Sequence, residues 1–244
     1  MLNRLDSPIP GALHEPALNA VFEPFRAGTP DRPFVVAQIG QSLDGRIATL
    51  SGESKYINGA AALDHLHTIR AHVDAVVVGV GTVVADDPLL SVRRVPGRSP
   101  ARIVIDPSGR LPRHARCLAG DAPCYVVCAE DAPAPRNAEP IRLPDRNGTL
   151  CPRAIVAALG RRGFSRILVE GGARTLAGFI DSGQVDRMHI LVSPVLIGSG
   201  KPALELKPIS ALADALRPDT RVYVLPGSDV LFDCDLQSVK GRHS

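Results

Sequence analysis

Short runs of aliphatic and β-branched residues recur along the chain, most of them closed by glycine, proline or aspartate. Runs of this length and composition are typical of strands buried on both faces of a mainly parallel sheet. The intervals between them suit a layered α/β fold, which we therefore expect. The expected strands cover residues 33–40, 75–79, 102–106, 124–128, 167–169 and 185–196.

Between these runs, apolar positions recur at the 3.6-residue spacing of helices. Leu63, Leu66 and Ile69 share one face of a segment that Asn58 can cap and that ends near Arg70. A second helix is expected to begin near Pro152, with Ile155, Val156 and Leu159 as its apolar positions. A third is expected from about Gly172 to Ser182, with Leu176, Phe179 and Ile180 apolar and Gly183 as the stop.

The two ends of the chain depart from this alternation. Residues 1–32 contain five prolines and few periodic signals, so we expect an extended amino-terminal arm there. Residues 33–244 are expected to form the folded domain, with no internal repeat. Within it, residues 221–225 and 230–236 flank a proline–glycine turn and predict an antiparallel hairpin at a sheet edge.

Composition narrows the functional class. A hydrophobic content of 45% with 22% charged residues is ordinary for a globular protein. The net charge is only +3 and the 28 basic residues are dispersed, which argues against nucleic acid as a partner and favours a small anionic ligand. No long apolar stretch or secretory signal is visible, so we expect no membrane association and a cytoplasmic location.

The cysteines give no sign of a disulfide framework or a metal site. They are five in number and include no C-x-x-C pair. We expect free buried thiols and no bound metal.

A strand, two glycines and a helix follow one another at residues 166–180. Glycines without a Cβ let the backbone approach a ligand closely, and the first N–H groups of a helix favour a diphosphate. The alternative is a tight turn in which Gly178 only allows close helix packing. Glu170 favours the ligand site slightly, because carboxyl ends of parallel strands are where open α/β sheets bind ligands.

Four sequence blocks together carry a resemblance: 42–48 (SLDGRIA), 51–54 (SGES), 78–90 (VGVGTVVADDPLL) and 169–176 (VEGGARTL). In order and spacing they resemble the reductase half of the bifunctional riboflavin-biosynthesis deaminase/reductase, over about residues 32–236. The resemblance implies a three-layer dihydrofolate-reductase-like fold with a mainly parallel sheet. It also implies a homodimer, NADPH as hydride donor and 5-amino-6-(5-phosphoribosylamino)uracil as substrate. The zinc-deaminase signatures H-x-E and P-C-x-x-C do not occur in this chain.

The resemblance also implies a set of substrate-binding residues. An arginine pair with a hydroxyl suits a phosphate monoester. On the residues alone, Arg70 is better explained as a solvated helix end and Arg93 as a dispersed surface arginine. The positions that match the family's substrate contacts are Ser54, Arg70, Leu90, Arg93 and Glu170.

Cofactor contacts are implied in the same way. Asp86 is the candidate catalytic residue, because a carboxylate could relay a proton or hold the ribityl hydroxyls, although Asp-Asp-Pro is also a turn signal. Tyr56 stands where the family commonly has tryptophan. Ser108, with Arg110, stands near the expected adenosine 2′-phosphate. The implied cofactor-binding residues are Gly40, Tyr56, Thr82, Asp86, Ser108, Gly171, Gly172, Ala173, Arg174, Thr175, Leu176 and Gly178.

Alternative functions remain open at this point. The same reaction could act on the diaminopyrimidinone compound that precedes deamination, or the reductase could be recruited to a pterin, folate or secondary metabolite. From a different class comes a non-catalytic nucleotide-binding module. Ser54, Arg70 and Arg93 beside the cofactor glycines argue against that module, which would need no substrate-phosphate site.

Overall fold

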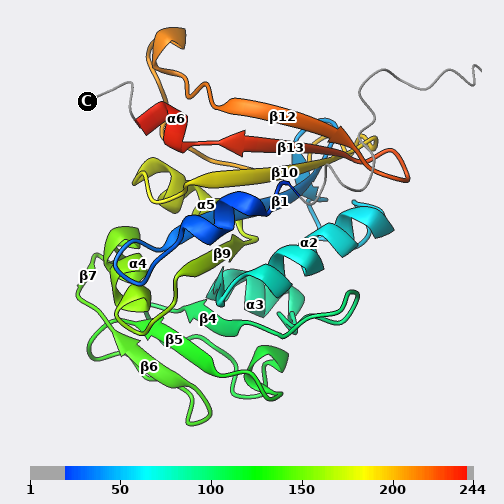
Figure 1. The fold of residues 1–244 in the computed structure, drawn as a ribbon. Coiled ribbons are helices and arrows are strands. Elements are labelled where there is room, and N and C mark those ends of the chain that lie inside the picture. The colour runs from blue at the N-terminus through cyan, green and yellow to red at the C-terminus, as the bar shows by residue number, and fades with distance from the viewer. Residues whose placement is uncertain (1–19, 241–244) are drawn as a thin grey trace, which may run out of the picture.

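The structure is a computed structural model that describes residues 20–240 and contains, within them, a nine-stranded sheet (Figure 1). In sheet order its strands are β12 (Asp219–Val224), β13 (Val230–Asp235), β10 (Arg187–Ser193), β1 (Phe34–Ser42), β9 (Arg166–Glu170), β3 (Ala75–Gly79), β4 (Ala101–Ile105), β5 (Cys124–Cys128) and β6 (Glu139–Arg142). The strands from β10 to β6 run parallel, whereas β13 and β12 extend the sheet antiparallel. The sheet is therefore mainly parallel with one antiparallel end.

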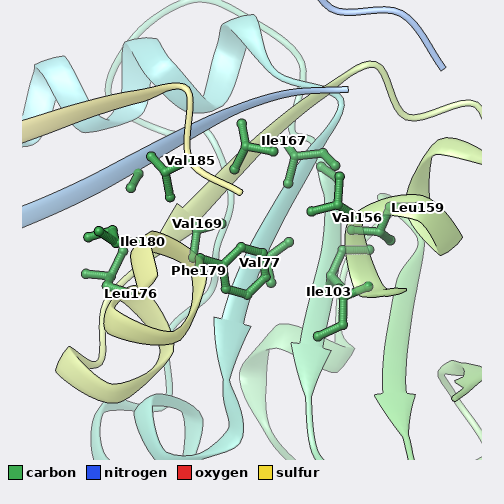
Figure 2. Packing of buried hydrophobic residues seen from close by; sticks show 14 of the residues in the cluster. Val77, Ile103, Val156, Leu159, Ile167, Val169, Leu176, Phe179, Ile180 and Val185 are labelled. Atoms are coloured by element: carbon green, nitrogen blue, oxygen red, sulfur yellow. The ribbon is translucent and has the colours of Figure 1, made fainter. Parts of the chain in front are cut away.

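Helices cover both faces of this sheet. Side chains of α2 (Ala60–His72) and α3 (Val80–Asp86) share one buried cluster with Val76 of β3. Side chains of α4 (Pro152–Gly160) and α5 (Ala173–Asp181) share the other cluster with Val77 of the same strand (Figure 2). Because successive strand residues point to opposite faces, the continuous apolar runs fill both cores at once.

Shorter elements connect these layers. Two small antiparallel pairs lie outside the main sheet, and four short helical turns occur within residues 20–240. These elements are β2 (Arg46–Ala48) with β11 (Lys201–Pro202), β7 (Asp145–Arg146) with β8 (Thr149–Leu150), and the turns η1 (Glu23–Ala27), η2 (Arg116–Leu118), η3 (Leu212–Asp214) and α6 (Gln237–Lys240).

The predicted fold class is confirmed: helices lie on both faces of a mainly parallel sheet that ends in an antiparallel hairpin. The predicted strands and helices are present with bounds shifted by a few residues. The hairpin is β12 and β13, and β12 is the outer strand.

The predicted cap of α2 is wrong. Gly59 occupies the N-cap position without a side-chain hydrogen bond, and its N–H donates to Asp229 Oδ2 at 2.6 Å. The Asn58 amide instead donates to the Leu191 carbonyl at 3.3 Å. Asn58 thus ties the start of α2 to β10 rather than capping it.

The expected amino-terminal arm is partly outside the described residues, which begin at residue 20. Residues 23–27 form η1 rather than extended chain, so the prediction is wrong there. Phe25 is 1% exposed and its ring lies 5.5 Å from that of Phe34 in β1, while Phe22 stacks on His72 of α2. Burial of two phenylalanines favours this packing over a free arm.

Two simple properties complete the description. No helix in residues 20–240 has the length and apolar character needed to cross a membrane. The five cysteines all fall within these residues and are free thiols as predicted, but the prediction that they are buried is wrong for Cys151, which is exposed.

Candidate functional site

A cleft of about 1410 Å³ opens at the carboxyl ends of β1, β9, β3 and β4. This is the edge at which parallel α/β sheets bind ligands, because the turns into the following helices meet there. Most of the sequence-predicted cofactor residues line it. They are Gly40, Tyr56, Thr82, Asp86, the turn 171–175 and Gly178.

The Gly171–Gly172 turn lies directly against Thr82. Both glycines have left-handed backbones, with φ of 61° and 57°, which glycine adopts without strain. A Cβ on Gly172 would stand 3.0 Å from Thr82 Oγ1. Ala173, the first residue of α5, lines the cleft, and no side chain caps this helix. The turn therefore fits an anionic group held by backbone amides.

A second helix begins at the same place. Gly79 is the uncapped N-cap of α3, and a Cβ there would lie 2.4 Å from Thr175 Oγ1. The starts of α3 and α5 are consequently packed against each other, through Gly79 with Thr175 and Thr82 with Gly172. Such contact requires glycine at both turns, so close helix packing and ligand binding are not exclusive explanations.

Arg70 and Glu170 form a buried bidentate ion pair. Arg70 Nε and Nη2 donate to Glu170 Oε1 and Oε2, each at 2.6 Å, and Nη1 donates to the Ser91 carbonyl at 3.1 Å. Burial opposes the charged form of Arg70, but attraction to Glu170 and its hydrogen bonds raise the arginine pKa overall. Arg70 is therefore not a solvated helix end. It does not line the cleft, whereas Glu170 does.

Arg93, in contrast, lines the cleft with its guanidinium free of hydrogen bonds and ion pairs to other described residues. Its backbone N–H donates to His67 Nδ1 at 3.1 Å. Burial and then the charges of Arg70, Arg116 and Arg94 lower its pKa. Positive charge is thus concentrated at this end of the cleft, as an anion site needs.

Asp86 and Ser54 meet across the cleft mouth. Ser54 Oγ donates to Asp86 Oδ1 at 3.4 Å, and both residues line the cleft. Asp86 is the last residue of α3 and is exposed. Tyr56, two residues after Ser54, is 88% exposed in a left-handed backbone of φ 66°, so its ring is available to a ligand.

In addition to Arg70, three other predicted site residues do not line the cleft. Leu90 is 1% exposed and Leu176 is fully buried in the core. Ser108 is exposed outside the cleft, while Arg110, two residues on, lines it. Contacts of these three residues with a ligand stay predictions.

Gln38 was missed from the sequence. It is 6% exposed and lines the cleft, and its side-chain amide makes no hydrogen bond with any described residue. In the sheet it is paired in register with Glu170 on one side and His189 on the other. The signal was visible as one polar residue inside an apolar strand, and a side-chain amide without a protein partner beside the cleft is available to a ligand or water.

Asn58 and Lys201 were also missed. A Cβ on Gly40 would lie 2.1 Å from Asn58 Oδ1, so the glycine at position 40 lets Asn58 reach the cleft. Lys201 enters from β11, which pairs with β2. Residues 20–240 contain no group of three or more histidine, cysteine or acidic side chains able to hold a metal ion.

The chain is similar to known proteins of one family. Residues 33–223 match the family model of the RibD C-terminal domain. The chain is 34% identical to the 2,5-diamino-6-ribosylamino-4(3H)-pyrimidinone 5′-phosphate reductase of Methanothermobacter thermautotrophicus, over 86% of this chain and 100% of that protein. It is 33% identical to the riboflavin biosynthesis protein RibD of Aquifex aeolicus over 70% of this chain, which corresponds to 49% of that longer protein.

A solved structure shows the same likeness. The deaminase/5-amino-6-(5-phosphoribosylamino)uracil reductase of Thermotoga maritima matches with a TM-score of 0.72 and 29% identity, over 84% of this chain and 56% of that one. This chain therefore spans about half of the bifunctional proteins and the whole of the archaeal reductase. It belongs to the RibD C-terminal domain family, of which the Aquifex relative is named a riboflavin biosynthesis protein.

Proposed function

We propose that the protein is an NADPH-dependent reductase of riboflavin biosynthesis that converts the ribosyl group of a phosphorylated ribosylaminopyrimidine into ribityl. The observation that carries this proposal is the single cleft in which the glycine turns of α3 and α5 face Glu170 and Arg93. Family membership supports the same reaction class. A non-catalytic binding module would need neither charged group.

The pyrimidine base has two candidates. The bifunctional relatives act, by the name of the Thermotoga protein, on 5-amino-6-(5-phosphoribosylamino)uracil. The archaeal relative, which this chain matches over its full length, is named for the 2,5-diaminopyrimidinone compound. Gln38 supports recognition of either base, because its free amide offers both a donor and an acceptor to a ring edge. Recruitment to a pterin, folate or secondary metabolite is the less supported reading.

The residues present fit a nicotinamide dinucleotide. When bound, NADPH would supply the hydride. The Gly171–Gly172 turn and the uncapped start of α5 suit its diphosphate, and Arg110 in the loop after β4 is available to a 2′-phosphate. Preference for NADPH over NADH is part of the proposal. Replacing Gly172 with valine should abolish NADPH binding in calorimetry, because a branched side chain would meet Thr82 and the diphosphate.

The remaining side chains bind and orient the substrate. Arg93 and Ser54 would hold its phosphate, and Glu170, fixed by Arg70, presents an ordered carboxylate to the reacting end. Asp86 is the proposed proton relay as the ribosylamine opens to its imine. Arg93→Ala should raise KM roughly 30-fold with little change in NADPH affinity, since a charge-assisted pair is lost.

The reaction itself is tested by NADPH consumption with the uracil and diaminopyrimidinone substrates side by side. Consumption with one or both supports the proposal and identifies the base. Absence of consumption with both would contradict it and leave the recruited reductase or the binding module.

We further infer a cytoplasmic homodimer. The outer strand β12 exposes Val222 at 47% and Val224 at 43%, and edge strands are usually paired or covered. Light scattering should give about twice the chain mass of 25.8 kDa. A monomer mass at micromolar concentration would contradict the dimer.

A further inference from the structure

The segment that follows α3 lies along α2 and is fixed to it at several points. It starts from Leu90, whose left-handed backbone of φ 55° turns the chain. Arg70 Nη1 donates to the Ser91 carbonyl at 3.1 Å, and Arg94 Nε donates to Asp64 Oδ1 at 2.6 Å. Two side chains of one helix thus hold the segment before and after residue 93.

His67 provides the contact at residue 93 itself. The Arg93 N–H donates to His67 Nδ1 at 3.1 Å, and His67 is 2% exposed. Asp64, His67 and Arg70 are three residues apart on α2, so they share one face of the helix. The three side chains on this face therefore hold residues 91–94 against α2.

Among the three arginines at this place, only the Arg93 side chain is free to bind a ligand. The Arg70 guanidinium forms an ion pair with Glu170, and the Arg94 guanidinium forms one with Asp64. The Arg93 guanidinium has no such partner among the described residues and lines the cleft. Its reach therefore depends on where the backbone at residue 93 is held, and His67 is the side chain that holds it.

We propose that His67 is a positioning residue for phosphate binding, which fixes the Arg93 backbone so that the arginine reaches the phosphate of the substrate. This inference rests on the proposed function, in which Arg93 contacts that phosphate. His67 itself does not line the cleft.

The electrostatic surroundings match this role. Nδ1 accepts a hydrogen bond only in the neutral ring, with the proton on Nε2. Burial, followed by the guanidiniums of Arg70, Arg93 and Arg94, lowers the pKa of His67 to about 4. The ring therefore stays neutral near pH 7 although it lies among three cations. Neither lysine nor arginine could accept this hydrogen bond.

A pair of substitutions separates the hydrogen bond from packing. His67→Leu fills a similar volume without an acceptor, whereas His67→Asn places Oδ1 on Cγ, as Nδ1 is in histidine. With the phosphorylated substrate, His67→Leu should raise KM roughly five- to tenfold and change kcat less than about twofold. His67→Asn should restore most of the KM. His72→Leu, a histidine of the same helix whose ring accepts no bond from residues 91–94, is the matched control.

The phosphate gives the discriminating readout. Binding of ribose 5-phosphate, followed by calorimetry without turnover, should weaken in His67→Leu by the same factor as KM. NADPH affinity and the rate with the dephosphorylated substrate should stay unchanged. In an Arg93→Ala background, His67→Leu should add no further loss, since the side chain that it positions is gone.

Outcomes distinguish this inference from the proposed function. If Arg93→Ala weakens ribose 5-phosphate binding but His67→Leu does not, His67 has no positioning role. If Arg93→Ala has no effect either, Arg93 does not bind the phosphate, and that part of the proposed function fails with it. Should His67→Leu not fold, amide exchange in the parent protein decides: Arg93 N–H should exchange far more slowly than an unprotected amide, and unprotected exchange would overturn the inference.

Discussion

Two buried arginine–carboxylate pairs lie over one face of the sheet, and only one of them borders the cleft. Arg70 with Glu170 and Arg187 with Asp233 are both bidentate, with N···O distances of 2.5–2.6 Å. Glu170 lines the cleft, whereas Asp233 is fully buried beside His189, whose Nε2 lies 3.3 Å from Asp233 Oδ1. We call them the open pair and the sealed pair.

The two pairs belong to one row of polar residues across the sheet. Glu170, Gln38, His189 and Asp233 are successive register partners on β9, β1, β10 and β13. The helix α2 covers the row, with Arg70 on Glu170 and His65 on His189. Burial and pairing are alike at both ends, so these features alone do not mark a site. Access to the cleft distinguishes the open pair, which we expect to affect activity, from the sealed pair, which we expect to affect only stability.

Breaking the sealed pair should have the largest effect. Arg187→Met leaves the Asp233 carboxylate buried beside a neutral histidine, and such an unpaired charge costs about 3–5 kcal/mol. Urea unfolding measures that loss, while kcat/KM of the folded fraction should be unchanged. The double variant Arg187→Met/Asp233→Leu should recover most of the stability. A drop in kcat/KM at full folding would show that the sealed pair communicates with the cleft.

Altering the open pair should affect catalysis next. Glu170→Gln keeps the shape of the side chain and removes its charge from the cleft. We expect a loss of about 2–3 kcal/mol in transition-state stabilisation, or roughly 30- to 150-fold in kcat/KM. Glu205→Gln, a second cleft carboxylate, is the matched control. Equal activity of Glu170→Gln and the parent enzyme would leave Glu170 as a structural residue only.

Mild acid should destabilise the fold through the buried histidines beside the sealed pair, at a pH above that at which carboxylates take up protons. Burial and then the neighbouring His189 lower the pKa of His65 to about 3, and burial lowers that of His189. The unfolded chain binds protons near the ordinary histidine pKa of 6.5, so the folded state loses stability as pH falls below 6.5. His65 alone should make the protein about 2 kcal/mol less stable at pH 5 than at pH 7, and His189 adds to that loss. Equal urea midpoints at both values would contradict buried neutral histidines.

Sequence patterns predicted most of the elements because strands buried on both faces leave continuous apolar runs, as at β3 and β9. The glycine turn before α5 was predictable for a similar reason, since left-handed backbone and a helix start both leave local signals. The resemblance placed Thr82, Asp86 and Arg93 at the same cleft, where the structure brings them together.

What the sequence did not predict depends on contacts between distant segments. Arg70 and Glu170 are 100 residues apart, and no local pattern shows that the arginine is committed to the carboxylate. Asn58 has the residue type of a cap, but the Leu191 carbonyl 133 residues away is its acceptor. Gln38 is visible as a polar residue in a strand, yet only the register of three strands shows that it lies between Glu170 and His189.

The smallest expected effects come from the same conservative change made at both pairs. Arginine to lysine keeps the positive charge but loses the two-pronged geometry that matches a carboxylate. Arg70→Lys should free one oxygen of Glu170 and lower kcat/KM about fivefold, with a minor change in the urea midpoint. Arg187→Lys should cost roughly 1–2 kcal/mol of stability and leave kcat/KM unchanged. Since the substitution is identical, any difference arises from what each carboxylate faces. If both variants lose activity to the same extent, or both lose only stability, access to the cleft is not what separates the two pairs.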